Sequence, residues 1–128
     1  MGSRISTLIT AFLLMFASVA TLNARSHGKK ETLHGYLVDV ACSRERAKEL
    51  AVLGQVHTKQ CLLMPDCQKS GYALLTAKHE VLKFDAAGNE EAKELITSTS
   101  RAKDYRVVVS GRRHGDELNV MQLELETP

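Results

Sequence analysis

The order of strand-like and helix-like segments constrains the fold of this chain more than any other feature. Alternating apolar residues bounded by turn residues predict five strands, with one helix-like segment between the third and the fourth. A long segment, residues 42–70, separates the first predicted strand from the second and has apolar residues at helical spacing. The five predicted strands cover residues 32–41, 71–77, 80–85, 105–112 and 118–125.

This order is that of the OB-fold, a five-stranded Greek-key barrel whose first connection is often elaborated. The sequence therefore predicts a mainly β (α+β) domain. We expect a five-stranded OB-like antiparallel barrel, with a helical, cysteine-containing insert after the first strand and a helix between strands three and four. Another small α+β domain with an antiparallel sheet is the alternative.

Capping residues predict where the helices begin and end. Ser43 is a suitable N-cap for a helix in the insert that ends at Gly54, and Pro65 ends a second helical stretch. Asn89 is a suitable N-cap for the helix before the fourth strand, since Glu90 then lies in its first turn. We expect that helix to have about ten residues.

The N-terminal segment has the pattern of a secretory signal peptide. Arg4 is followed by an uncharged, largely apolar run that extends to Ala24, and polar residues within the run make it a poor membrane span. We expect cleavage after Ala24, a flexible arm at residues 25–31 and a single OB-like domain at residues 32–126. The product is then secreted or periplasmic, without a membrane anchor.

Charge and motifs exclude some classes of function. The chain has 17 Lys and Arg residues against 15 Asp and Glu residues, so it lacks the strongly basic balance of a nucleic-acid binder. Nucleic acid is not expected as a partner. Neither G-x-S-x-G nor H-E-x-x-H occurs, and we therefore predict no catalytic residues, no cofactor-binding residues and no enzymatic activity.

A spaced set of residues runs through most of the predicted domain. It consists of Gly35-Tyr36-Leu37-Val38-Asp39, Cys42, His57, Cys61, Cys67, Ser70-Gly71-Tyr72 and Val107-Val108-Val109-Ser110-Gly111. Over residues 33–125 the chain resembles a group of small secreted bacterial proteins of uncharacterised function with the pattern G-[WY]-[IL]-x-D-x-x-C followed by a histidine and two cysteines. The resemblance implies an OB-fold-like barrel and export. The long insert and the spacing of Cys61 from Cys67 depart from that group.

The three cysteines of the insert allow three interpretations. In an oxidising compartment two of them pair, which would constrain the insert by about 2–4 kcal/mol and leave one thiol free. Alternatively Cys42, His57, Cys61 and Cys67 bind zinc or copper, with Asp39 as an outer contact, because thiolates and imidazoles at short spacing suit these metals. His57 and Cys61 are four residues apart, which places them on one face of a helix. In the third interpretation a cysteine beside His57 is redox-active, although Cys-x-x-Cys is absent.

From these observations we predict an exported, non-enzymatic binding or envelope-accessory domain with a disulfide-stapled insert. The alternative function is metal binding, to zinc or copper, or thiol redox chemistry at the cysteine and histidine cluster. The ligand and the partners are not defined by the sequence.

Overall fold

The computed structural model describes residues 28–127, so the predicted signal peptide and residues 25–27 of the predicted arm lie outside the described residues. None of the described helices is both long enough and apolar enough to cross a membrane. In chain order the elements are β1 (Lys30–Asp39), α1 (Val40–Glu45), the 3₁₀ helix η1 (Ala47–Glu49), α2 (Leu50–Val56), α3 (Lys59–Leu62), α4 (Pro65–Ser70), β2 (Tyr72–Thr76), β3 (Val81–Phe84), α5 (Ala86–Ser98), β4 (Arg106–His114) and β5 (Glu117–Leu125).

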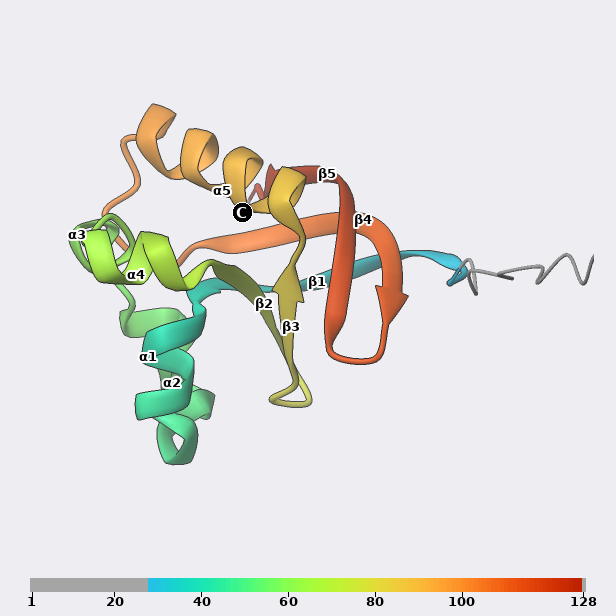
Figure 1. Cartoon of the computed structure of the whole chain (residues 1–128). Helices are drawn as coiled ribbons and strands as arrows, with labels where there is room; N and C mark the ends of the chain where they lie inside the picture. The colour runs from blue at the N-terminus through green and yellow to red at the C-terminus, as the bar shows by residue number, and fades with distance from the viewer. Residues whose placement is uncertain (1–27, 128) are drawn as a thin grey trace, which may run out of the picture.

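The five strands form a closed barrel in the order β1-β2-β3-β5-β4, which confirms the predicted OB-like architecture (Figure 1). Every pairing is antiparallel except that of β3 with β5, which is parallel. The expectation of a wholly antiparallel barrel is therefore wrong. The reason is parity: strand direction cannot alternate all the way round a closed ring of five strands, so one neighbouring pair has to run in the same direction.

Two predicted boundaries also differ from the structure. β1 begins at Lys30, which pairs with Arg112 of β4, so the end of the predicted arm is strand. α5 begins at Ala86 with Asp85 as its N-cap, because the Asp85 side chain accepts a hydrogen bond from Gly88 N–H. The predicted cap, Asn89, lies inside the helix and accepts a hydrogen bond from the backbone N–H of Tyr72.

The barrel interior holds the main hydrophobic core. Its buried residues come from all five strands, from α5 and from Leu62 of the insert. α5 covers one open end of the barrel (Figure 1), and it approaches β5 so closely at Gly88 that a Cβ there would overlap Val120. Glycine at this position therefore allows the helix to seal the core.

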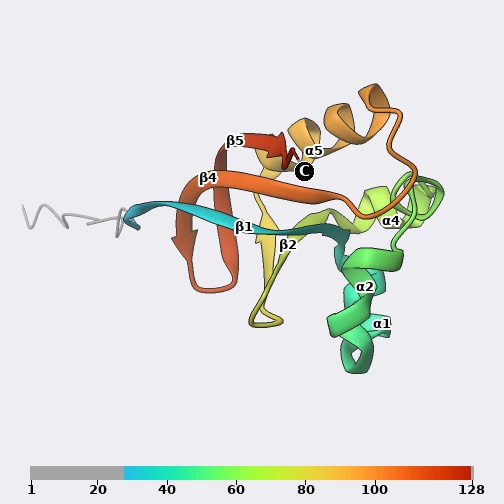
Figure 2. The ribbon, with the colours of Figure 1, turned by 180° about the vertical axis from the view of Figure 1, so that it is seen from behind.

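The connection between β1 and β2 is the predicted helical insert, built as four short α-helices and η1. In the views from both sides, α1 and α2 project from the end of β1, away from α5 and β5 (Figures 1 and 2). A second, smaller cluster of buried residues lies beneath them: Val38, Val40, Leu53, Ala73 and Leu75. The insert is thus attached to the barrel by its own small core.

Candidate metal centre

Asp39 occupies the junction at which β1 ends and the insert begins. It has extended backbone angles and serves as the N-cap of α1, where its Oδ1 accepts a hydrogen bond from Cys42 N–H at 2.8 Å. Capping satisfies one of the N–H groups that the first turn of a helix leaves without a partner. The predicted cap, Ser43, instead lies within α1 and donates to the carbonyl of Val40. The Asp39 side chain is fully buried.

The second carboxylate oxygen of Asp39 faces His57, the residue that ends α2. Oδ2 lies 2.8 Å from His57 Nε2, and both side chains are almost completely buried. The two atoms are within ion-pair distance, yet neither makes an aligned hydrogen bond to any group in the described part of the chain. A carboxylate oxygen has two lone pairs, so Oδ2 can contact His57 and still bind a second partner.

Two thiols complete the cluster. The Sγ atoms of Cys42 and Cys67 and a carboxylate oxygen of Asp39 all lie within 4.8 Å of one another. Cys42 is in α1 and Cys67 is in α4, so the group joins the first and last helices of the insert. Among the described residues all three cysteines are free thiols. The predicted disulfide is thus absent here, although Cys42 and Cys67 are close.

Backbone contacts fix the positions of the elements that carry these side chains. The N–H of Val40 donates to the carbonyl of Gly71, and the N–H of Ala41 donates to Oγ of Ser70. Ser70 Oγ in turn donates to the carbonyl of Cys67. The start of α1 is therefore bonded to the end of α4, which holds the two thiols near each other.

The electrostatic setting keeps the thiols protonated when no cation is present. Burial, followed by the negative charge of Asp39, raises the pKa of Cys42 to about 12, and the same two causes raise the pKa of Cys67. For Asp39 burial acts to raise the pKa, but the contact with His57 and the N–H of Cys42 outweigh it, so its pKa lies below the ordinary value. The cluster is therefore a carboxylate with two neutral thiols.

The structure brings together only part of the predicted ligand set. Cys42 and Cys67 converge, whereas Asp39, predicted as an outer contact, is inside the group and His57 contacts the group through it. Cys61 lies outside the group. His57 and Cys61 do not share a helix, because α2 ends at Val56 and Thr58 caps the new helix α3.

One signal in the sequence pointed to the central position of Asp39. An aspartate three residues before Cys42 fits an N-cap that bonds the Cys42 N–H, and such a cap directs its carboxylate to the first helical turn. Comparison of the chain with protein-family models, with curated proteins and with solved structures found no match.

Proposed function

We propose that this chain is a non-enzymatic, exported binding domain whose insert binds a transition-metal ion through Asp39, Cys42 and Cys67. The observation that carries the proposal is the fully buried Asp39 carboxylate, which has one oxygen within 4.8 Å of the thiols of both Cys42 and Cys67. A cation between these three groups would satisfy the oxygen and stabilise both thiolates.

The spacing of the three groups suits a tetrahedral ion. With Zn–S near 2.3 Å and Zn–O near 2.0 Å, the ligands of tetrahedral zinc are roughly 3.3–3.8 Å apart. The observed separations, within 4.8 Å, need only small side-chain movements to reach these values. A site with three protein ligands keeps its fourth position open to water or to another ligand. The half-buried Cys42 leaves this position near the surface.

The ligand types favour zinc over copper(I). Copper(I) is selected by soft thiolate and thioether ligands, whereas zinc also accepts carboxylate oxygen. His57 then acts as an orienting contact, since an imidazole beside a ligating carboxylate fixes its direction. The thiol-redox alternative is less favoured, because a reactive cysteine needs a lowered pKa and that of Cys42 is raised.

The test is zinc binding by the reduced protein and by single cysteine variants. We expect one zinc ion per chain by native mass spectrometry and competition with a chromophoric chelator, and loss of that ion in Cys42→Ser and Cys67→Ser. Cys61→Ser is the matched control and should keep zinc, because Cys61 is outside the group. Equal loss in all three variants would favour the four-ligand set predicted from the sequence, and absence of zinc from the reduced protein would refute the proposal.

The proximity of Cys42 and Cys67 supports a second candidate, the disulfide-stapled insert of a binding domain without metal. Their sulfur atoms are within 4.8 Å, and a disulfide between them would join α1 to α4. Alkylation of the exported protein before reduction distinguishes the two candidates. A single reactive thiol, assigned to Cys61 by peptide mapping, supports the disulfide, whereas three reactive thiols after zinc removal support the metal centre.

A further inference from the structure

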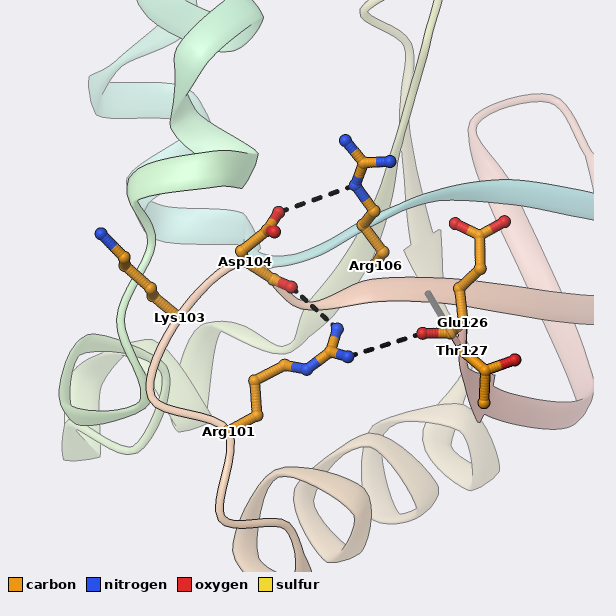
Figure 3. Close-up of a pocket in the computed structure, with 6 residues that line it drawn as sticks. All are labelled: Arg101, Lys103, Asp104, Arg106, Glu126 and Thr127. Atoms are coloured by element: carbon orange, nitrogen blue, oxygen red, sulfur yellow. Dashed lines mark hydrogen bonds and ion pairs between the residues drawn. The ribbon is translucent and has the colours of Figure 1, made fainter.

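A hollow at another part of the surface is lined mainly by charged residues. It has a volume of about 560 Å³, which is within the range of small-molecule sites. Its lining comes from the loop before β4, the start of β4 and the end of the chain: Arg101, Lys103, Asp104, Arg106, Glu126 and Thr127 (Figure 3). These residues are not those of the cysteine cluster.

Arg101 supplies a fixed positive charge to this hollow. Its guanidinium donates to the backbone carbonyls of Asp104, at 3.0 Å, and Glu126, at 3.5 Å (Figure 3). Carbonyl groups orient the guanidinium without neutralising it, and within residues 28–127 Arg101 has no carboxylate partner in an ion pair. The other N–H groups of Arg101 are left to bind an anion.

The loop that carries Arg101 is held rigidly. The Tyr105 hydroxyl donates to the carbonyl of Arg101, and Lys59 N–H donates to the carbonyl of Ala102 at 2.7 Å. Asp104 has a φ of 59°, a conformation that is uncommon for a residue other than glycine. Because the loop is already ordered, a ligand would bind without the entropic cost of ordering it.

Arg106 provides a second cation and links the hollow to a neighbouring one. Its guanidinium lies 5.4 Å from the centre of the Tyr36 ring, and its Nε is 3.8 Å from Asp104 Oδ1, a loose ion pair. A smaller hollow of about 210 Å³ shares Arg106 and Glu126 and is also lined by His34 and Tyr36. The two adjoining hollows are treated together as one groove, which is bordered by Arg101 and Arg106 and also lined by the Tyr36 ring.

The groove also contains groups that accept hydrogen bonds. Glu126 is held by a contact of 3.0 Å to His34 Nδ1, and the Asp104 side chain is 48% exposed although its Oδ1 is buried. A simple inorganic anion would provide no further donors to these carboxylates. A ligand with both an oxyanion and hydroxyl groups satisfies the cations and the carboxylates together.

We infer that this groove binds an acidic sugar, either as a free monosaccharide or as the terminal unit of an oligosaccharide. The oxyanion binds to the guanidinium group of Arg106, which both hollows share, while Arg101 adds a second positive charge to the larger hollow. The hydroxyls donate to Asp104 and Glu126, and the sugar ring lies beside Tyr36. The inference is independent of metal binding. The oxyanion is a carboxylate or a phosphate, and the experiment separates these two sources.

The experiment is a titration followed by the backbone amide signals of the protein. The probes are galacturonic acid and glucose 6-phosphate, with galactose and inorganic phosphate as controls. We expect at least one acidic sugar to shift amides at residues 101–106 and 126, with an affinity about tenfold above those of galactose and phosphate, since a tenfold gain, about 1.4 kcal/mol, is what one charge-assisted hydrogen bond contributes. The stronger of the two acidic sugars identifies the oxyanion.

Two arginine variants locate the site. Arg106→Gln should lower the affinity about tenfold for the loss of one charge-assisted contact. Arg112→Gln is the matched control, because it removes the same charge from the other end of β4 and should leave the affinity unchanged. The inference is overturned if neither acidic sugar binds, if galactose or phosphate binds as tightly as the acidic sugar, or if Arg112→Gln weakens binding as much as Arg106→Gln.

Discussion

At the scale of single residues, the pair formed by Asp39 and His57 decides how the insert is anchored. Asp39 contacts both α1, through the Cys42 N–H, and α2, through His57, while it is itself the last residue of β1. A buried ion pair is expensive to form because both groups lose their hydration. The pair joins the end of β1 to both α1 and α2.

Replacing one of the two residues tests how much their contact contributes to the stability of the metal-free protein. We expect His57→Gln to lower the free energy of unfolding of the zinc-free protein by about 1–3 kcal/mol, because the amide replaces the imidazole contact to the buried Asp39 carboxylate only in part. Urea denaturation measures the change. His34→Gln is the matched control, since His34 forms an exposed pair with Glu126 and should lose only about 0–1 kcal/mol. Equal losses would show that the buried pair has no special role.

The sequence predicted the site residues better than their arrangement. The predicted ligands were Cys42, His57, Cys61 and Cys67, with Asp39 as an outer contact, whereas the structure groups Cys42 and Cys67 with Asp39. The prediction that His57 and Cys61 share one face of a helix was wrong. Thr58 lies between them and begins a new helix, because its side chain accepts a hydrogen bond from Cys61 N–H. Residues four apart lie on one face only when they belong to the same helix.

At the scale of elements, Asp85 connects three parts of the barrel. It caps α5 through Gly88 N–H at 3.0 Å, and the same Oδ1 accepts from Val120 N–H of β5 at 3.2 Å. Its own N–H donates to the carbonyl of Leu118. The parallel pairing of β3 with β5 covers only Lys83–Glu117 and Phe84–Leu118. The hydrogen bonds of Asp85 to Leu118 and Val120 therefore continue the contact between β3 and β5 beyond these two residue pairs.

We predict that Asp85→Ala destabilises the barrel more than the removal of an ordinary surface charge. The expected decrease in the free energy of unfolding is about 1–2 kcal/mol for the cap, and removal of the hydrogen bond from Val120 N–H adds to it. Asp116→Ala, which removes an exposed ion pair with Lys83, is the control and should cost about 0–1 kcal/mol. Urea denaturation of both variants is the measurement, and similar decreases would argue against the role of Asp85 at the closure.

The helix boundary at Asp85 shows why sequence patterns indicated the element but not its start. Asn89 followed by glutamate residues is a good capping pattern, and Asp85 followed by Ala86 is another. The structure uses Asp85 because its side chain also reaches β5, whereas Asn89 is needed to accept from Tyr72 N–H. The choice depends on interactions between distant segments, which one sequence does not display.

At the scale of the whole molecule, the barrel and the insert have separate cores of unequal size. The barrel core includes residues of all five strands and α5, whereas the insert rests mainly on a cluster of five buried residues. The barrel topology was predictable from segment order. A closed barrel with an odd number of strands must have at least one parallel pair. The predicted number of strands was five, so this pair could have been expected from the sequence, but the prediction did not include it.

Hydrogen exchange should reveal the difference between the two cores. In the zinc-free, reduced protein we expect amides of α1 and α2 to exchange by local opening, well before those of Val107 and Val109 in β4, because the apolar cluster beneath α1 and α2 is smaller than the barrel core. Addition of zinc should slow exchange in α1. Exchange at equal rates in the insert and in β4, with or without zinc, would contradict this division.

The length of the connection between β1 and β2 has a consequence for how fast the protein folds. β1 pairs with β2 across residues 40–71 and with β4 across a still longer stretch, whereas β4 and β5 form a hairpin with a tight turn at Gly115. Closing a long loop costs entropy before its stabilising interactions form, so we expect the hairpin early and β1 late. A link between Cys42 and Cys67 shortens the effective loop, and the cell compartment's supply of zinc or oxidant would then set the folding rate.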